Sequence, residues 1–397
     1  MTTNKADNTS VVSIVKADSY DFARVYSAVE KCLGLIGGLD KIVKRGDNVF
    51  LKINHLPPSS PPEKGIITHP VFVKAVVENL KKFDVNISVG DDIGSEPVGQ
   101  RDPEGVDGFT VSGIRQVCRE TNVSLVNLRE AGFVETDCHG FVLDKVYVSK
   151  IVLNADVVIN LPKLKTHSLM GYTGGIKNMF GAVPKGKRLQ YHYNYQEREV
   201  FSQVLVDIFS VIKPTLTIID GIMAMEGEGP ASGNVRKLGL VLASRDTLAL
   251  DTVVTKIIGL EPSNILTNKY AGKKGLGAGN LRDINTVGEK VEYVSVTDFK
   301  LPATHQGKKV NKVLDVLSTF IQKRNVTKPK ILTPLCVGCM ECKNTCPANA
   351  ISVLDAKASV DRKKCISCFC CHEACRYNAI ILKKPWYMRM LKSLASS

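Results

Sequence analysis

Two runs of four cysteines near the end of the chain share one spacing, and this spacing constrains the fold more than any other feature. Each run reads C-x-x-C-x-x-C-x-x-x-C, and the runs comprise Cys336, Cys339, Cys342 and Cys346, then Cys365, Cys368, Cys371 and Cys375. The tripeptide Asn-Ala-Ile recurs at the same offset, beginning at Asn349 and at Asn378. Three thiolates spaced in this way on a tight loop can each reach one iron of a [4Fe-4S] cube. The repeat therefore predicts a duplicated unit that binds two [4Fe-4S] clusters.

A zinc site and a disulphide framework are the alternatives for such cysteines. A tetrahedral zinc ion takes four ligands and would leave the third cysteine of each run without a role. The sequence MTTNKADNTS at the start has no charged stretch followed by an apolar one, so we expect no secretory signal and a cytoplasmic protein with reduced thiols. We expect the three scattered cysteines, Cys32, Cys118 and Cys138, to be buried as small apolar residues.

The cysteine segment resembles the bacterial two-cluster ferredoxins, in which the fourth cysteine of each run binds the other cluster. The resemblance implies one cluster held by Cys336, Cys339, Cys342 and Cys375, and a second held by Cys365, Cys368, Cys371 and Cys346. The chain departs from the repeat at two positions, because Arg376 stands where the first run has Pro347 and Cys370 adds a thiol beside Cys371. The added thiol leaves open whether Cys370 replaces Cys371 as a ligand.

Length and charge set the broad class of the protein. At 397 residues, of which 44% are hydrophobic, the chain can bury a large core, and its length suggests about two to three domains. No apolar run approaches the roughly 18 residues that a membrane-spanning helix needs. The formal net charge is +14, although each cluster with its four thiolates would add about two negative charges.

Much of the basic excess flanks the cysteine runs. Lys308, Lys309, Lys312, Lys323, Arg324, Lys328 and Lys330 precede them, and Lys383, Lys384, Arg389 and Lys392 follow them. No interleaved aromatic residues accompany the first group, so we expect a solvated linker that could dock an acidic partner and no nucleic-acid partner. Trp386 lies among the second group. The tail could therefore form a short amphipathic helix that docks on the protein itself or makes, at most, peripheral contact with a membrane.

Short β-branched runs alternate with segments of helical period through about the first 300 residues. The predicted strands are residues 11–15, 49–53, 85–89, 123–126, 157–161, 216–219 and 238–243, and the clearest helices are 20–35, 70–83 and 247–258. This alternation predicts an α/β domain with a mostly parallel sheet and flanking helices. We expect the α/β domain at 1–305, a basic linker at 306–332, a small α+β ferredoxin-like domain at 333–384 and a basic amphipathic tail at 385–397.

Polar residues follow several predicted strands, where ligands bind in open α/β sheets. The segment NLPKLKTHSLMGYTGGIKNMFG places Lys163, Lys165, His167 and Lys177 around Gly174 and Gly175. Glycines that open a helix free backbone N–H groups for an anion, so we predict an anion site that also includes Lys52, Asn54 and Asn178. The alternative for each lysine is a solvated surface charge.

A second glycine-rich loop, DGIMAMEGEGPASG, supplies Asp220, Glu226 and Glu228. Carboxylates on such a loop could bind a divalent metal or act as acid or base, and solvated turn residues are the alternative. Neither glycine loop matches a P-loop or the G-x-G-x-x-G fingerprint in its required context, so we predict neither a nucleotide kinase nor a Rossmann dehydrogenase.

These motifs together resemble the domain-of-unknown-function family 362. The resemblance lies in residues 52–54 and 90–91, the segments NLPKLKTH and GGIKNMFGAVP, His192, DGIMAMEGEGPASG and residues 246–251. It covers about residues 45 to 255, and members of the family often carry a two-cluster ferredoxin module at one end. The family implies no settled substrate, and fold analogy cannot supply one.

Our leading hypothesis is an iron–sulphur redox protein whose clusters exchange electrons with a small anionic metabolite or cofactor in the α/β domain. Lys163, Lys165, His167 and Lys177 would orient the anion, and Glu226 or Asp220 would handle a divalent metal or protons. One alternative is an electron carrier or maturation partner whose large domain docks a redox partner protein. Another is a transferase in which the clusters are structural.

Overall fold

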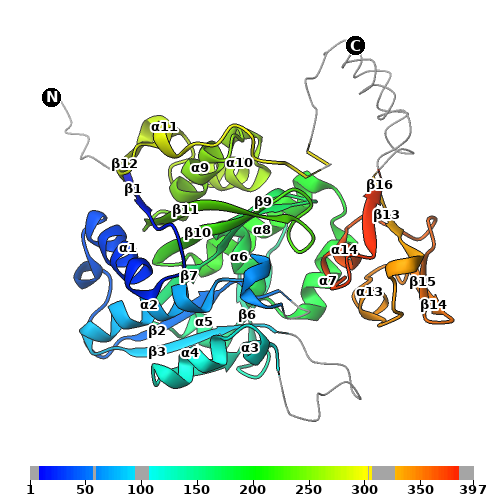
Figure 1. Cartoon of the computed structure of the whole chain (residues 1–397), viewed down its shortest axis with the longest axis horizontal. Coiled ribbons are helices and arrows are strands. Elements are labelled where there is room, and N and C mark those ends of the chain that lie inside the picture. Colours follow the sequence, from blue (N-terminus) through cyan, green and yellow to red (C-terminus); the bar gives the residue numbers. More distant parts are fainter. Residues whose placement is uncertain (1–8, 57–59, 94–106, 303, 306–326, 384–397) are drawn as a thin grey trace.

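The computed structural model describes residues 9–56, 60–93, 107–302, 304–305 and 327–383. Within these residues the main sheet has ten strands, in the order β12-β1-β11-β10-β7-β2-β3-β4, with β8 beside β10 and β9 beside β8 (Figure 1). The strands are β1 (Ser10–Lys16), β2 (Asn48–Ile53), β3 (Asn86–Asp91), β4 (Ser124–Asn127), β7 (Val157–Leu161), β8 (Lys163–His167), β9 (Gly171–Thr173), β10 (Leu216–Glu226), β11 (Asn234–Ser244) and β12 (Ile284–Gly288).

The predicted, mostly parallel α/β sheet is confirmed in its central part. Strands β10, β7, β2, β3 and β4 run parallel, whereas β11 is antiparallel to both β10 and β1. The sheet is therefore mixed at one side. There β10 and β11 form a long ribbon that extends past the predicted strands, because the pairing continues to Glu226 and Asn234.

Helices cover both faces of the sheet because its central strands alternate their apolar side chains. Val49, Leu51 and Ile53 of β2 pack into one buried cluster with α1, α2 and α4, while Phe50 packs into a second with α8. The helices are α1 (Phe22–Leu35), α2 (Pro70–Leu80), α3 (Gly108–Val111), α4 (Ile114–Glu120), α5 (Lys150–Leu153), α6 (Gly175–Asn178), α7 (Lys185–Asn194), α8 (Arg198–Ile212), α9 (Thr247–Ile257), α10 (Leu266–Lys273) and α11 (Val291–Val294). A separate hairpin pairs β5 (Phe133–Asp137) with β6 (Lys145–Ser149).

Local sequence signals explain where the long helices begin. Pro70 occupies the first turn of α2, where its fixed φ and missing N–H cost nothing. The Asp21 carboxylate caps α1 by accepting from Arg24 N, and Asp246 caps α9 by accepting from Ala249 N. Cys32, Cys118 and Cys138 are buried, as expected.

The order of the strands marks one position at the edge of the sheet. From β2 the chain adds β3 and then β4 on one side, and it returns to place β7 on the other side of β2. The connections that leave β2 and β7 therefore diverge, which opens a crevice at the carboxyl ends of these strands.

The C-terminal module is small and α+β, as predicted. It pairs β13 (Lys328–Ile331) with β16 (Ile380–Lys383) and β14 (Ile351–Leu354) with β15 (Lys357–Val360), beside the short helices α13 (Glu341–Asn344) and α14 (Cys370–Glu373). Since β13 pairs with β16, the module begins at Lys328 rather than at residue 333. The remainder of the predicted linker, up to residue 326, and the predicted tail, residues 385–397, lie outside the described residues.

None of the helices within the described ranges combines the length and the apolar character needed to span a lipid bilayer.

Candidate functional site

Two cavities in the module are each surrounded by four cysteines, three from one run and one from the other. Cys336, Cys339, Cys342 and Cys375 line the first, of about 360 Å³, and Cys346, Cys365, Cys368 and Cys371 line the second, of about 310 Å³. These are the two groups that the ferredoxin resemblance implied. Cys371 lines the second cavity and Cys370 does not. Among the described residues, no group of three or more His, Cys, Asp or Glu is placed to hold a single metal ion.

The backbone around the two cavities repeats as the sequence does. Left-handed residues recur at matching positions: Gly338 and Ser367, Met340 and Phe369, Asn349 and Asn378. The N–H of Ala350 donates to Cys346 Sγ at 3.2 Å, and the N–H of Ala379 donates to Cys375 Sγ at 3.3 Å. Amide donors to sulphur stabilise thiolate ligands and adjust the potential of a bound cluster. The donor set therefore fits [4Fe-4S] clusters.

A larger cavity lies between the α/β domain and the module, where α7 and α14 meet (Figure 1), with an empty volume of about 1010 Å³ that is partly open to solvent. Cations dominate its wall. The α/β domain contributes Lys52, Asn54, His55, Asp91, Lys165, Lys177, Asn178, Gly181, Lys185, Arg188 and His192, and the module contributes Glu341, Thr345, Cys370, Glu373 and Ala374. We call this space the junction cavity.

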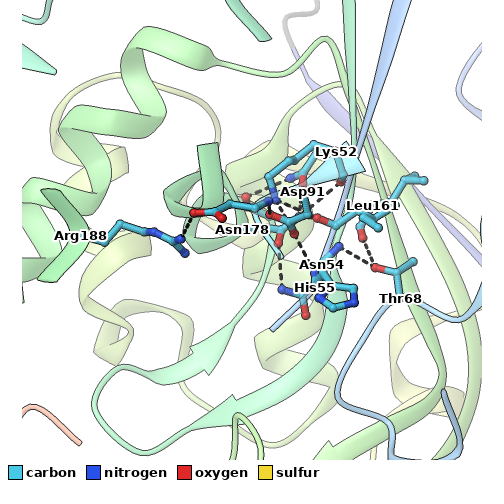
Figure 2. A network of polar contacts seen from close by, with 12 residues as sticks. Lys52, Asn54, His55, Thr68, Asp91, Leu161, Asn178 and Arg188 are labelled. Carbon is cyan, nitrogen blue, oxygen red and sulfur yellow. Dashed lines mark hydrogen bonds and ion pairs between the residues drawn. The ribbon is translucent and has the colours of Figure 1, made fainter. Parts of the chain in front are cut away.

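The base of the junction cavity is a fixed ion pair at the ends of two parallel strands. Lys52 Nζ lies 2.8 Å from Asp91 Oδ2, and both side chains are buried. The same Asp91 oxygen accepts from His55 N at 2.7 Å, as Figure 2 shows. Arg188, on α7, points toward this group and pairs with Asp92. The crevice predicted at the strand ends is thus lined by charged groups that hold one another in place.

Three hydrogen-bonded asparagines connect the floor of the junction cavity to α6 and β7. Asn54 Nδ2 donates to Asn178 Oδ1 at 3.0 Å, Asn178 Nδ2 donates to Asn160 Oδ1 at 2.8 Å, and Asn160 Nδ2 donates to Gly175 O at 2.9 Å (Figure 2 shows the first pair). Because each amide is held by the next, the wall of the junction cavity is rigid. Lys52, Asn54 and Asn178, predicted as part of one site, do lie together.

Lys165, which is buried, and Lys177, which is half-buried, differ from the lysines that pair with aspartates. Lys165 Nζ donates to the carbonyl of Ile66 at 2.6 Å and has no carboxylate within ion-pair distance in the described chain. Burial, and then the charge of Lys177, lowers the pKa of Lys165 to about 7. Lys177 makes no hydrogen bond or ion pair with any described residue, and burial lowers its pKa too, against the opposing charge of Glu373. Two amino groups thus face the junction cavity without a paired carboxylate.

The module faces these lysines with Glu373. Glu373 Oε1 lies 3.3 Å from His167 Nε2, which joins α14 to the end of β8. Burial lowers the pKa of His167 well below its ordinary value, and it lowers the pKa of His192 to about 3. Both imidazoles are therefore neutral at physiological pH.

The remaining predicted catalytic residues lie elsewhere. Lys163 Nζ is 2.9 Å from Asp220 Oδ2 and donates to the Tyr20 hydroxyl at 2.6 Å. Neither Lys163 nor Asp220 lines the junction cavity. Glu226 ends β10, where its carboxylate accepts from Lys300 N at 3.1 Å. The structure thus brings Asp220 together with Lys163 of the predicted group, and it places neither Asp220 nor Glu226 on the wall of the junction cavity with Lys165.

The predicted anion site at Gly174 and Gly175 is also corrected. The N–H groups of Gly175 and Ile176 donate to the Asp251 carboxylate at 2.8 and 3.0 Å. Asp251 comes from α9 and is buried. The N–H groups at the start of α6 are therefore occupied by the Asp251 carboxylate. An anionic ligand would have to bind to the neighbouring lysines instead.

Several residues of the junction cavity carry little sequence signal. Lys185 and Arg188 belong to the basic segment KGKRLQYH, which could have been considered because it follows the predicted site directly. Glu341 and Glu373 each lie two residues after a cysteine, at positions that nothing in the spacing distinguishes. Only the packing of the module on the α/β domain brings them to the lysines.

Comparisons with known proteins agree with both resemblances. The family described as "Domain of unknown function (DUF362)" matches residues 49–256, and a 4Fe-4S dicluster domain matches residues 328–376. The thylakoid-associated protein sll1697 of Synechocystis sp. is 35% identical over 266 residues, which cover 67% of this chain and 79% of that protein. The lactate racemase apoprotein of Thermoanaerobacterium thermosaccharolyticum matches with a TM-score of 0.38 and 11% identity, over 60% of this chain and 54% of that one.

Proposed function

The chain belongs to the family of the domain of unknown function DUF362 and carries a 4Fe-4S dicluster domain, and from this premise we propose that it passes electrons between two [4Fe-4S] clusters and an anionic substrate or cofactor bound in the junction cavity. One observation carries the proposal. The same cavity is walled by unpaired lysines of the α/β domain and by the cysteine module.

The unpaired lysines argue for an anionic ligand. A buried ammonium without a counter-ion costs several kcal/mol, even after the protein relaxes around it. Lys52 and Lys163 avoid this cost by pairing with Asp91 and Asp220, whereas Lys165 and Lys177 do not. A carboxylate, phosphate or similar group between Lys165 and Lys177 would supply the missing counter-charge and accept hydrogen bonds from both.

The position of the cysteines argues for electron exchange. Cys370 lines the junction cavity, and its neighbours along α14 and the preceding loop, Cys368 and Cys371, line the second cysteine cavity. Glu341 lines both the junction cavity and the first cysteine cavity. When bound, the clusters would supply or take up single electrons at this wall. A ligand in the junction cavity would lie beside Cys370, the residue next to Cys371 of the second cysteine cavity.

The side chains of the α/β domain can manage protons for such a reaction. Lys165, with a pKa of about 7, can hold or release a proton at neutral pH, which suits a general acid or base. Neutral His192 can donate or accept a hydrogen bond without adding charge. The module covers one side of the junction cavity and limits the access of water, which strengthens charge interactions within it.

The proposal is tested by reoxidation of the reduced protein. Reconstituted protein is reduced without oxygen, freed of reductant and mixed with sulfate, phosphate and a panel of carboxylates and oxo-acids, while visible absorbance reports cluster oxidation. We expect at least one reducible anion to accelerate reoxidation and Lys177→Gln to weaken this effect. Lys187→Gln is the control, because Lys187 lies on α7 over Tyr147 and does not line the junction cavity. Equal rates with and without every anion would favour the electron carrier that docks another enzyme.

A further inference from the structure

The first cysteine cavity opens at a surface that is unusually apolar. Four large apolar side chains surround it or adjoin it, with exposed fractions of 49% for Leu335, 52% for Val337, 46% for Met340 and 43% for Tyr377. Isolated apolar residues on a surface need no explanation, but a group of them around one opening marks a contact site.

The second cysteine cavity lacks such a surface. Phe369, which follows Cys368 as Met340 follows Cys339, is 4% exposed and packs with Phe201 and Phe180 in a core cluster of the α/β domain. Ile366, the counterpart of Val337, lines the second cavity and is only partly exposed. The duplicated unit therefore has one cysteine site turned toward the α/β domain and one turned outward.

Cations surround the outward site. Lys357 Nζ donates to the carbonyl of Cys336 at 2.7 Å, Lys343 is exposed on α13, and Arg376 precedes Tyr377. Residues 328–383 contain nine Lys and Arg against four Asp and Glu. Of those four, Glu373 lines the junction cavity, and Glu341 lines both that cavity and the first cysteine cavity, where it lies 3.9 Å from Arg376. The basic excess of the module therefore remains after this one acidic residue of the outer part is counted.

We infer that this outer face, formed by Leu335, Val337, Met340 and Tyr377 with Lys343, Lys357 and Arg376, docks an acidic one-electron carrier protein. An apolar centre with a charged rim is the usual anatomy of a protein interface, and electron-transfer contacts are small and brief. A second copy of this chain would bring two basic rims together, which opposes docking, whereas an acidic carrier is steered toward the rim. The inference adds a partner to the proposed function and rests on it.

Electrons then follow a defined order. With clusters bound at both cysteine sites, the reduced carrier would be oxidised by one electron, the cluster at the first cysteine site would be reduced, and the oxidised carrier would dissociate. A later transfer within the module would pass this electron to the cluster at the second cysteine site, beside the junction cavity. The carrier is the only co-reactant that this step requires.

The test measures docking directly, with an acidic [2Fe-2S] ferredoxin as the probe and cytochrome c as the basic control carrier. The Kd of the reconstituted full chain for oxidised ferredoxin is measured by calorimetry at low and high salt. We expect binding that weakens with salt, and no comparable binding of cytochrome c. Met340→Glu and Val337→Glu place a carboxylate in the apolar centre and should each raise the Kd at least about tenfold, since about 1.4 kcal/mol is lost.

Matched controls separate docking from folding and from the junction cavity. Tyr293→Glu changes a side chain that is 74% exposed on α11, in the α/β domain far from the module (Figure 1), and should leave the Kd unchanged. Dithionite should reduce all variants equally, which shows intact clusters. Anion-dependent reoxidation reports on the junction cavity alone, so its failure and the failure of docking are separate results. Equal affinity of every variant, equal binding of cytochrome c, or self-association abolished by Met340→Glu would each overturn the inference.

Discussion

Two kinds of lysine can be distinguished at the scale of single residues, among the buried Lys52, Lys163 and Lys165 and the half-buried Lys177. Lys52 and Lys163 each lie within 3 Å of an aspartate and serve as fixed parts of the scaffold. Lys165 and Lys177 face the junction cavity without such a partner. Whether a lysine is paired depends on carboxylates that are distant in the sequence and close in the fold. A lysine-rich segment alone therefore cannot show which of its lysines are paired.

The protonation of Lys165 makes anion binding depend on pH. Its pKa is about 7 because burial disfavours the ammonium form. Below pH 7 the charged form attracts an anion, and above it the neutral amine does not. We expect the affinity for sulfate, whose charge is constant in this range, to fall about tenfold as pH rises from 6 to 9. Calorimetry at several pH values checks this.

Lys165→Met should remove most of this pH dependence and weaken sulfate binding at pH 6. A bound anion favours the ammonium, so the decline should begin near pH 7, the pKa in the free protein, and end at the higher pKa of the complex. Affinity that stays constant or increases with pH would contradict the assignment.

Gly181 permits the close approach of the Lys52–Asp91 pair. A Cβ at this position would lie 2.7 Å from Lys52 Nζ and 2.9 Å from Asp91 Oδ1. We expect Gly181→Ala to lower the free energy of unfolding by about 1–3 kcal/mol, through overpacking and a disturbed buried pair. Thermal and urea unfolding measure this loss. Gly186→Ala on α7, where a Cβ meets nothing within 4 Å, should be neutral or stabilising by up to about 1 kcal/mol.

At the scale of secondary structure, α6 shows how a short element is positioned by a distant one. It has only four residues, and its first N–H groups bind Asp251 of α9. Tyr172, on β9, also donates to this carboxylate, at 3.2 Å. A buried carboxylate with these donors acts as a cap supplied by another helix.

Asp251→Asn should release this cap. The amide keeps the shape but loses the charge, so we expect the free energy of unfolding to fall by about 1.5–3 kcal/mol. The control is Asp298→Asn, an exposed partner of Arg236, where the change should stay within about 0.5 kcal/mol. Urea unfolding distinguishes the two, and equal stability of both variants would show that the cap is unimportant.

The elements themselves were largely predictable because their signals are local. The predicted strands at 49–53 and 157–161 and the start of a helix at Pro70 agree with β2, β7 and α2. Residues 163–167 follow the predicted strand 157–161 and belong to none of the predicted strands, whereas in the structure they form β8. The pattern Lys-Leu-Lys-Thr-His does alternate, but its polar side faces buried partners from other segments, which single-sequence reasoning assigns to solvent.

At the scale of the whole molecule, the two halves of the duplicated module have different environments. Phe369 is buried against the α/β domain, and its counterpart Met340 is exposed. Both have φ near +65°. The sequence identified the repeat and the two sets of cysteines, but it could not tell which half faces inward, because that depends on a surface of the other domain.

These counterparts form a matched pair for mutation. Phe369→Ala should cost about 3–5 kcal/mol of packing and loosen the module, so that limited proteolysis between the domains becomes faster and sulfate binding weaker. Met340→Ala, at the same backbone position, should leave both unchanged. Similar behaviour of the two variants would contradict the assignment of an inner and an outer half.

The most direct test of the central claim is an anaerobic EPR spectrum of the reduced, reconstituted protein, recorded with and without the anion that binds best. We predict signals of two interacting [4Fe-4S] clusters, of which the one associated with Cys346, Cys365, Cys368 and Cys371 changes when the anion binds. Lys177→Gln should abolish this change while leaving the signals themselves intact. Two cluster signals that no anion alters would contradict the claim that electrons and ligand meet in the junction cavity.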